Sequence, residues 1–581
     1  MKDKKLDYKE LDYKGKRNII FWNGDKSEKI YVYDENLSKD LLVFENMDDI
    51  VENYYRKYYT KNTRLIYINH IKVWIYYLSE YFPEVKSFLQ SESYQDKDTN
   101  IVIKINFNNY KTKQIKEKFY SLSSLVVNAM EDTLNKSDLS YINKLSIVKD
   151  YILNITATYK GHTIASMARN ERNLICNKFN TPETIEKYGH PLPFYDLRNS
   201  EDSEINANIR EAYHGGMNYL NWNKVNRELN NIYHFDCNSF YPYIQSRFPL
   251  PKGEGMVKEI NKKVCTLQEY MLLIEYKLIM NKKLGILDVI VELKSNKGYD
   301  NDVLKIFCSR YDNSKSGYLR KSERGFPCYR LFLTNLDVGL LFWLYDVKNL
   351  YLLKIREFET CKGRFNEFIY KYYTKKAELK EEINSKSTLE EKIPLIMERE
   401  KVKSILNFST GGDGQKRYNY NNCYLPYIVF TTAFSRKLIL FLISKLKDEF
   451  IYTNTDYIIC TEAGKNILLN YINLSDRLGD WKLERIAKRF KILNHNTYIE
   501  EDENGKLYTC LGGLDKQLST FITFENFNYN TEIGQEEITL YNNQNDNKIN
   551  PFKIITELDS IFMSERKYKI NNPQFTSIGF E

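Results

Sequence analysis

The chain has 581 residues, of which 42% are hydrophobic and 28% are charged, a composition typical of a soluble globular protein with several domains. Lys and Arg (85) exceed Asp and Glu (77), and the net charge of +8 is compatible with nucleic-acid binding without establishing it. The nine cysteines form no Cys-x-x-Cys pair and there are only six histidines, so we expect a reducing compartment and no zinc site.

Two patterns bear on localisation. Residues Met1–Asp7 are charged where a signal peptide would need an apolar core. The longest apolar runs, such as Phe430–Ile443, are interrupted by Thr, Ser, Arg and Lys. We therefore expect no membrane segment and a cytoplasmic protein.

The first third of the chain predicts strands followed by helices. Strand-like patterns occupy Asn18–Trp22 and Lys29–Tyr33, and Thr63–Phe82 predicts a strand that passes into a helix. Helices are predicted over 112–160, where four apolar residues recur at helical spacing: Ile115, Phe119, Leu122 and Val126. Three prolines and a glycine make Thr181–Pro193 the best candidate for a domain boundary.

The middle of the chain carries the first candidate site. The stretch Tyr233–Pro242 predicts an apolar strand that ends on Asp236, followed by a tight turn into a helix running towards Arg247. A carboxylate at a strand end, beside exposed backbone carbonyls, is suited to bind a hard cation such as Mg²⁺. Most strand-end aspartates are only turn residues, so this position alone identifies no function.

A second acidic residue strengthens the pattern. Ile451–Cys460 predicts a hairpin with Asn-Thr-Asp at its tip, where Asp456 could meet Asp236 across one sheet. Two such carboxylates can hold the paired metal ions of phosphoryl or nucleotidyl transfer. The alternative is an ordinary α/β protein with two turn aspartates.

The segments around these two stretches predict a mixture of elements. Leu272–Leu341 mixes strands and turns, and Gly363–Asn407 is highly charged and helical, with Pro394 expected to divide it into two helices. Thr410–Lys416 predicts a turn that lacks the spacing of a P-loop. An apolar helix is expected over Phe430–Lys445, and Leu478–Ile499 is basic with an aromatic finish.

Three short sequence motifs resemble those of family B DNA polymerases. Asp236-Cys-Asn-Ser-Phe-Tyr-Pro242 resembles motif A, usually Asp-x-x-Ser-Leu-Tyr-Pro, and Tyr452-Thr-Asn-Thr-Asp-Tyr457 resembles motif C, Tyr-x-Asp-Thr-Asp-Ser. Between them, Lys403-Ser-Ile-Leu-Asn-Phe-Ser-Thr-Gly411 is similar to motif B, Lys-x-x-x-Asn-Ser-x-Tyr-Gly. The order A, B, C is that of the family.

Other segments resemble motifs of the protein-primed branch of this family, which is found in small tailed bacteriophages. Ala212-Tyr-His-Gly-Gly216 is similar to its Tyr-x-Gly-Gly element, and the segment from Leu478-Gly-Asp-Trp-Lys-Leu-Glu484 to Ile499 is similar to its segment with Lys-x-Tyr. Thr523-Phe-Glu-Asn-Phe527 resembles its thumb, and Thr334-Asn-Leu-Asp-Val338 the end of its first terminal-protein-region insertion. The resemblance covers roughly residues 205–530.

The resemblance implies an α+β fold: a right-hand polymerase of palm, fingers and thumb, with an N-terminal degenerate exonuclease-like (RNase H-like) domain. The expected domains are an inactive exonuclease-like domain at 1–190, palm with motif A at 191–255, palm and terminal-protein-region insertion at 256–360, fingers with motif B at 361–425, palm with motif C at 426–500, and thumb at 501–581.

The resemblance also implies roles for individual residues. Asp236 and Asp456 would be catalytic and would hold two Mg²⁺ ions, for which Mn²⁺ could substitute, with the Cys237 carbonyl as a further ligand. Six residues would bind the nucleotide, with Tyr241 as a steric gate beneath the sugar: Ser239, Phe240, Tyr241, Lys403, Asn407 and Lys376. Five would contact DNA: Tyr213, Gly215, Gly216, Thr497 and Tyr498.

The implied partners are template DNA, dNTPs and a terminal protein that serves as primer. The chain would act as a monomer or as a heterodimer with terminal protein, in the cytoplasm of an infected bacterial host. Two alternatives stay open: a catalytically inactive relic that binds DNA or terminal protein, and a polymerase of a linear plasmid.

Several positions depart from the family pattern. Asn454 replaces the first aspartate of motif C, Thr410 the tyrosine of motif B, and Asn496 the lysine of Lys-x-Tyr. The family's exonuclease needs Asp-x-Glu, Asn-x-x-x-Asp and Tyr-x-x-x-Asp, but residues 1–150 contain no Asp-x-Glu. His70, Trp74 and Leu145 stand at positions of the other two motifs, so we expect no 3′–5′ exonuclease activity.

Overall fold

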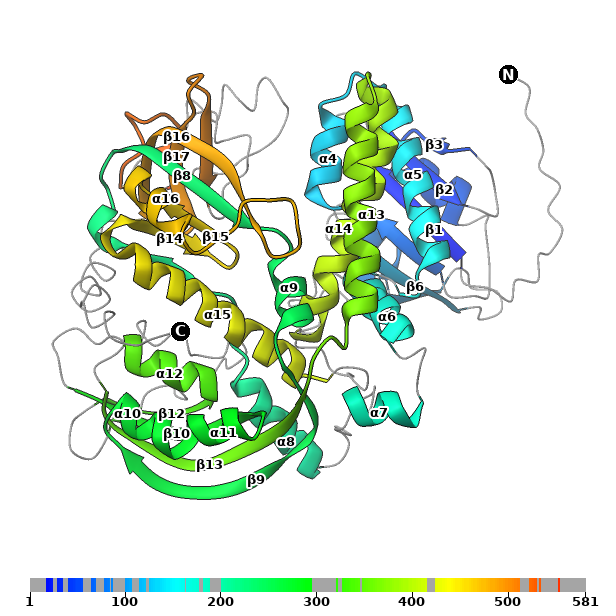
Figure 1. Cartoon of the computed structure of the whole chain (residues 1–581). Helices are drawn as coiled ribbons and strands as arrows, with labels where there is room; N and C mark the ends of the chain where they lie inside the picture. Colours follow the sequence, from blue (N-terminus) through cyan, green and yellow to red (C-terminus); the bar gives the residue numbers. More distant parts are fainter. Residues whose placement is uncertain are drawn as a thin grey trace, which may run out of the picture. The chain divides into compact units, whose positions relative to one another are not determined.

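The structure is a computed structural model of the chain (Figure 1). The residues it describes are 17–23, 29–34, 40–55, 64–68, 78–83, 85–86, 100–106, 114–121, 125–161, 163–176, 181–188, 200–294, 320–321, 327–344, 347–414, 424–511, 522–529, 532–533 and 552–553. The chain divides into two compact units: unit 1 comprises Met1–Glu171 and Thr374–Ile405, and unit 2 comprises Arg172–Tyr373 and Leu406–Glu581.

Unit 1 contains a six-stranded mixed sheet of order β3-β2-β1-β4-β6-β5. The strands β1, β4 and β6 run parallel to one another, and β2, β3 and β5 are antiparallel to their neighbours. Their bounds are β1 Arg17–Asn23, β2 Ile30–Asp34, β3 Leu42–Phe44, β4 Arg64–Ile68, β5 Asn100–Asn106 and β6 Gln114–Ser121. The two strands predicted from the N-terminal pattern are confirmed as β1 and β2.

The prediction of helices over 112–160 is wrong in its first part. Ile115 and Phe119 lie in β6, which pairs with β4 and β5. A spacing of four residues fits one face of a strand as well as one face of a helix, so the partner strands decide the outcome. After β6, the described part of this region is helical from α4 onward: α4 Asn128–Asn135, α5 Tyr141–Thr158 and α6 Ile164–Cys176. Two short helical segments lie earlier in the chain, α1 Met47–Ile50 and η1 Val51–Tyr55.

The charged helical segment divides at a different place from the one predicted. The two helices are α13 Asn366–Ser385 and α14 Leu389–Gly414, and Pro394 lies inside α14. The start of α14 is set by a capping box, because Thr388 Oγ1 accepts from Glu391 N (3.3 Å) and Glu391 Oε2 accepts from Thr388 N (3.3 Å). Pro394 removes one helical hydrogen bond without ending the helix, and α14 continues through the turn predicted at Thr410.

Unit 2 contains a seven-stranded sheet of order β18-β17-β16-β8-β15-β14-β7, antiparallel throughout. The strand that ends at Asp236 and the hairpin around Asp456 are confirmed as β8 and as β14 with β15. The bounds are β7 Asn218–Leu220, β8 Leu229–Cys237, β14 Phe450–Asn454, β15 Tyr457–Cys460, β16 Trp481–Asn494, β17 Thr497–Glu501 and β18 Leu507–Leu511.

Unit 2 also contains a five-stranded sheet of order β11-β12-β10-β13-β9. Its strands are β9 Leu250–Val264, β10 Lys283–Leu293, β11 Arg320–Lys321, β12 Pro327–Thr334 and β13 Val347–Cys361. The prediction of only strands and turns over Leu272–Leu341 missed helical segments on both sides of β10. These are η5 Met271–Glu275, α11 Tyr276–Met280 and α12 Asn335–Leu344, and a further short helix, α10 Leu267–Tyr270, precedes the predicted range.

The apolar helix predicted at Phe430–Lys445 is confirmed as α15 Pro426–Leu446, which lies between the seven-stranded sheet and α12 (Figure 1). Within Pro426–Glu449 the most apolar window has a mean hydropathy of 1.5, enough to cross a membrane by length and composition. However, 78% of this window is buried inside the protein, which is the condition of a core helix. Its burial joins the apolar faces of both sheets into one core.

The remaining described elements of unit 2 are short. They are α7 Pro182–Tyr188, α8 Ser200–Glu211, η4 Trp222–Lys224, α9 Phe240–Arg247, η7 Lys447–Glu449, α16 Glu462–Leu468, β19 Glu532–Ile533 and β20 Phe552–Lys553. The helix α9 follows β8 after only two residues, as the sequence predicted.

Candidate active site

Asp236 and Asp456 lie on neighbouring strands in the middle of the seven-stranded sheet. Asp236 is the penultimate residue of β8 and pairs with Tyr457, the first residue of β15. Asp456 precedes Tyr457 in the turn that joins β14 to β15, and its carbonyl accepts a hydrogen bond from Cys237 N at 2.9 Å. The register therefore brings the two acidic residues to the same end of the sheet.

The turn that carries Asp456 is held by backbone contacts. Thr455 has a φ of +69°, a left-handed conformation that costs energy for a β-branched residue. Its N–H donates to the carbonyl of Met217 at 2.6 Å, and Asp456 N donates to Asn454 O at 2.9 Å. The segment before β7 thus supports the strained turn.

The electrostatics of the pair are unbalanced. Burial and the nearby charge of Asp236 raise the pKa of the Asp456 carboxyl from 3.8 to about 7. Asp236 itself is partly exposed and has an ion pair with Lys482, whose Nζ lies 3.2 Å from Oδ2. A bound cation would reduce the repulsion between these two carboxylates.

The donor set fits a hard divalent cation with an incomplete protein shell. Among the described residues, no group of three or more His, Cys, Asp or Glu side chains is placed to hold a metal ion. Mg²⁺ is commonly bound by one or two carboxylates, with waters and substrate phosphates as its other ligands. Asp236 and Asp456 match that pattern.

The predicted steric gate and the Tyr-x-Gly-Gly segment lie against each other. Tyr241 is in the first turn of α9, which starts after Ser239, a residue with a φ of +52°. A Cβ on Gly216 would lie 2.7 Å from the Tyr241 hydroxyl and 2.8 Å from Thr455 Oγ1. Gly216 is therefore required for three chain segments to meet beside the carboxylates.

The two asparagines that depart from the family pattern contact each other. Asn454 Nδ2 donates to Asn496 Oδ1 at 3.0 Å, and the Tyr452 hydroxyl donates to the same oxygen at 2.9 Å. The backbone N–H of Asn496, whose φ is +54°, donates back to the Tyr452 hydroxyl at 3.0 Å. A neutral amide pair thus joins the turn of Asp456 to the turn before β17.

A buried ion pair holds the Tyr213–Gly216 segment through hydrogen bonds to its backbone. Arg436 of α15 and Asp337 of α12 are both fully buried and form two hydrogen bonds, of 2.9 and 2.8 Å. Arg436 Nη1 also donates to the carbonyls of His214 (2.7 Å) and Gly215 (2.6 Å). The sequence did not indicate Arg436, because it lies in an apolar helix.

The other predicted site residues are distributed over both units. Lys376 and Lys403 belong to unit 1, and Lys403 has an ion pair with Glu400 at 3.5 Å. In unit 2, Asn407 is exposed, whereas the Phe240 side chain is buried in the core. His70 and Trp74 lie outside the described residues.

Thr497 and Tyr498 begin β17, close to the asparagine pair. The Thr497 hydroxyl donates to the His495 carbonyl at 3.3 Å, and the ring of Tyr498 packs on Phe490 with centroids 5.4 Å apart. Burial raises the pKa of the Tyr498 hydroxyl, so this group stays protonated at neutral pH.

The sequence also missed two side chains beside the carboxylates. Lys482 and Glu484 of β16 form an ion pair of 2.5 Å, and Lys482 contacts Asp236. Both lie in the basic, family-like segment that begins at Leu478, but no role was assigned to either, and Lys482 is 246 residues after Asp236. The strand pairing that brings them together could not be read from that pattern.

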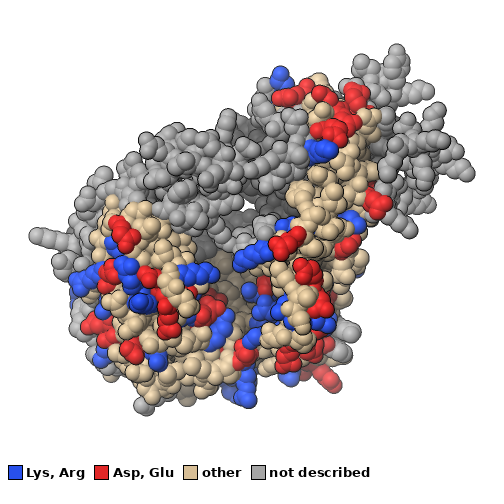
Figure 2. Space-filling view, turned by 90° about the horizontal axis from the view of Figure 1, so that it is seen from above, with Lys and Arg blue, Asp and Glu red and all other residues tan. Residues whose placement is uncertain are grey.

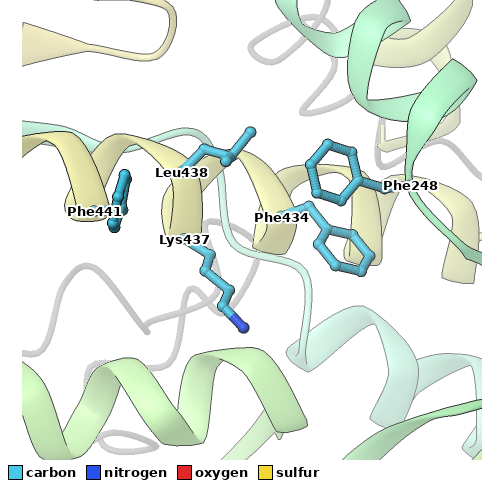
Figure 3. A pocket seen from close by; sticks show the side chains of 5 residues that line it. All are labelled: Phe248, Phe434, Lys437, Leu438 and Phe441. Atoms are coloured by element: carbon cyan, nitrogen blue, oxygen red, sulfur yellow. The ribbon is translucent and has the colours of Figure 1, made fainter. Parts of the chain in front are cut away.

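A cavity of about 240 Å³ lies along α15 (Figure 3). Its lining is mostly apolar and includes none of the predicted site residues: Phe248, Phe434, Lys437, Leu438 and Phe441. Burial lowers the pKa of Lys437, against the raising effect of Glu275. Nothing in its lining resembles a site for phosphate chemistry.

Surface charge does not mark a binding face by itself. Figure 2 shows acidic and basic side chains interspersed over the described part of the face in view. This agrees with the modest net charge of +8.

Comparison with known proteins identifies the family. A family model described as DNA polymerase type B, organellar and viral, matches residues 5–407. The chain belongs to this family. The resemblance to the family B polymerases of bacteriophages, stated from the sequence, is therefore confirmed.

Curated type B relatives come from bacteriophages. The chain is similar to the DNA polymerase of Bacillus phage phi29, with 28% identity over 356 residues, and to that of Streptococcus phage Cp-1, with 26% identity over 324 residues. The alignments cover 56% and 50% of this chain. They span 57% and 51% of the relatives, so the chain matches little more than half of their length.

Similarity to solved structures of other proteins shows the fold of the chain. The phi29 DNA polymerase in an orthorhombic crystal form matches with a TM-score of 0.64 and 18% identity, covering 89% of this chain and 96% of that one. Phi29 DNA polymerase complexed with primer-template DNA and incoming nucleotides matches with a TM-score of 0.59 and 18% identity, covering 89% and 95%. The fold is that of a right-hand family B polymerase.

Proposed function

We propose that the chain is a DNA-directed DNA polymerase that transfers nucleotides from dNTPs to a primer hydroxyl under the direction of a template. The observation that carries this proposal is the meeting of Asp236 and Asp456 at one end of the central sheet. Membership of the type B family supports it, as do relatives that are named DNA polymerases.

Asp236 and Asp456 would hold two Mg²⁺ ions, or Mn²⁺ in their place, with the Cys237 carbonyl as a further ligand. Such ions lower the pKa of the attacking hydroxyl and neutralise charge on the triphosphate. Because the pKa of Asp456 is raised to about 7 before a cation binds, metal binding would release a proton from this carboxyl near neutral pH.

The nucleotide would lie against the start of α9, beside the two carboxylates. We assign Tyr241 to the sugar, since its hydroxyl is backed by Gly216 and cannot retreat without moving the Asp456 turn. Ser239 and Phe240 would contribute through the turn that starts α9. The resemblance also assigns nucleotide binding to Asn407 and, in unit 1, to Lys376 and Lys403, whose positive charge would stabilise a triphosphate.

DNA would be held on both sides of the carboxylates. Tyr213, Gly215 and Gly216 precede β7, and Thr497 and Tyr498 begin β17, so these two segments flank the turn of Asp456. Solved complexes of phi29 DNA polymerase contain primer-template DNA and nucleotides, which supports the same partners for this chain.

The remaining assignments concern priming and domain roles. We infer that a terminal protein supplies the priming hydroxyl, that the chain acts as a monomer or as its heterodimer, and that it works in the cytoplasm of an infected bacterium. The palm would comprise 191–255 and 426–500, with palm and terminal-protein-region insertion at 256–360, the fingers at 361–425 and the thumb at 501–581.

The N-terminal domain (1–190) would keep an RNase H-like exonuclease fold without its activity. Its sheet order and the parallel trio β1, β4 and β6 support such a fold. The absence of Asp-x-Glu supports inactivity, since carboxylates hold the metals of that reaction. Mg²⁺-dependent shortening of a labelled 3′ end without dNTPs would contradict this assignment.

Primer extension on a synthetic template tests the polymerase directly. The parent should extend the primer with Mg²⁺, and Asp456→Asn should reduce the rate by at least about 100-fold, because one metal ligand loses its charge. Equal extension by parent and variant, or none by either, would favour the inactive relic. The neutral Asn454 is the observation that keeps the relic in consideration.

A further inference from the structure

Lys482 occupies a distinctive place beside the carboxylates. It lies directly opposite Asp236 in the pairing of β16 with β8, and its Nζ is 3.2 Å from Asp236 Oδ2. The same ammonium lies 2.5 Å from Glu484 Oε1. The side chains of Lys482, Asp236 and Glu484 are 41%, 24% and 46% exposed, so the ammonium can move without opening the core.

We propose that Lys482 is a resident counter-ion of Asp236 that a divalent metal ion must displace, and that Glu484 receives the ammonium when it leaves. This inference rests on the proposed function only in treating Asp236 as a metal ligand. It assigns a positioning role to two residues of β16 for which the sequence indicated no role.

The competition follows from the contact itself. An ammonium at hydrogen-bond distance uses the oxygen that a metal ion would bind, and two cations on one carboxylate repel each other. The protein therefore neutralises Asp236 before metal arrives, at the cost of some metal affinity. The charge of Lys482 also lowers the pKa of Asp456, but burial and the charge of Asp236 outweigh it and raise that pKa.

The backbone supplies the alternative partner. The pairing of β16 with β8 shifts between Leu483 and Arg485, so Glu484 is the extra residue of a bulge. A bulge re-aims side chains, and here it lets Glu484 reach the ammonium of a residue two positions earlier. Burial would lower the pKa of Lys482, but the bond to Glu484 and the charge of Asp236 outweigh it and raise the pKa.

The test measures metal binding on the full chain at one pH and ionic strength, without DNA or nucleotide. Free Mn²⁺ is counted by electron paramagnetic resonance during a titration. Lys482→Met should bind Mn²⁺ about 2- to 5-fold more tightly than the parent, the range expected for a partly exposed ion pair. Lys488→Met on the same strand removes the same charge and should leave the dissociation constant unchanged.

Glu484→Gln separates the receiver role from that of a third metal ligand. Without its alternative partner the ammonium holds Asp236 more firmly, so Mn²⁺ should bind about 2- to 5-fold more weakly. In the Lys482→Met background the same change should weaken Mn²⁺ binding clearly less, because only one nearby negative charge is then lost. Equal weakening in both backgrounds would overturn the receiver role of Glu484.

Asp236→Asn distinguishes failure of this inference from failure of the proposed function. If Asp236→Asn loses Mn²⁺ binding and Lys482→Met does not tighten it, the counter-ion role is wrong and the metal site stands. If Asp236→Asn binds Mn²⁺ as tightly as the parent, both are wrong. Tighter binding by Lys482→Met in a chain that extends no primer would support the inference and contradict the polymerase.

Discussion

Unit 2 holds two acidic groups in opposite circumstances. Asp337 is completely buried, yet Arg436 balances its charge with two hydrogen bonds and also satisfies the carbonyls of His214 and Gly215. Asp456 is less buried, but burial and the charge of another carboxylate, Asp236, raise its pKa to about 7. The first arrangement is complete within the protein, and the second is complete only when a cation binds.

The contrast separates what holds the site from what acts in it. The Arg436–Asp337 pair fixes the segment before β7, and that segment supports the turn of Asp456 through Met217. Strain and unbalanced charge at the turn are thus tolerated because a balanced pair stabilises its neighbour. Substitutions on the two sides of this contrast should therefore have opposite effects on stability.

The largest effect is expected from Arg436→Met. Removing one partner of a fully buried pair leaves Asp337 charged and unpaired, so the free energy of unfolding should fall by about 3–5 kcal/mol. Denaturant unfolding monitored by circular dichroism measures this. Arg489→Met, which breaks partly exposed pairs with Glu228 and Glu501, is the control and should cost clearly less, about 1 kcal/mol. Equal losses would remove the distinction between the two kinds of charge.

Asp456→Asn should stabilise the protein in the absence of metal. A carboxyl whose pKa is raised in the folded state from 3.8 to about 7 destabilises the fold increasingly as pH rises through this range. At pH 8 in a chelator the variant should be more stable by roughly 2–4 kcal/mol, and at pH 4 the difference should vanish. Thermal unfolding across pH measures it, and a gain that is independent of pH would refute the electrostatic cause.

Gly216→Ala should damage the site where three segments meet. The added methyl group would lie within 2.9 Å of the Tyr241 hydroxyl and the Thr455 side chain, so we expect about 1–3 kcal/mol of destabilisation. Primer extension should weaken with it. Gly339→Ala in α12 is the control, since a Cβ there meets nothing within 4 Å and alanine favours a helix. A neutral Gly216→Ala would mean that the turn of Asp456 is free to move.

The smallest effect concerns the asparagine pair. Asn454→Asp and Asn496→Lys should each cost about 1 kcal/mol, because each change disturbs the hydrogen bond between the two amides. The double variant should recover about 1 kcal/mol relative to the sum, since an ion pair replaces the lost bond. Unfolding of all four proteins completes the cycle. Strict additivity would show that the two departures from the family pattern arose independently.

Local patterns predicted most elements next to Asp236 and Asp456. The strand before Asp236, the helix after it and the hairpin around Asp456 are each short apolar stretches bounded by turn residues, and such patterns identify their elements directly. The strand β6 was mistaken for a helix because its apolar residues are four apart, which both periods allow. The sequence predicted that the helix breaks at Pro394. The break comes before Leu389 instead, because a capping box at Thr388 and Glu391 starts α14 there.

Contacts between distant segments could not be predicted in this way. Lys482 reaches Asp236 only because β16 pairs with β8 in one particular register. Arg436 meets Asp337 after 99 residues, and its helix otherwise reads as core. Such pairs depend on how elements pack, and a single sequence contains no periodicity that reports packing.

The division of the chain has a consequence for biosynthesis. Unit 1 combines the first 171 residues with Thr374–Ile405, where Lys401 Nζ donates to Asn154 Oδ1 at 3.0 Å. At 5–20 residues per second, a ribosome needs on the order of 10–40 s to make the intervening residues. During that interval the apolar face of α5 lacks the helices that complete its unit. The N-terminal part of unit 1 is therefore expected to stay partly folded, and open to chaperone binding and aggregation, until residue 405 has left the ribosome.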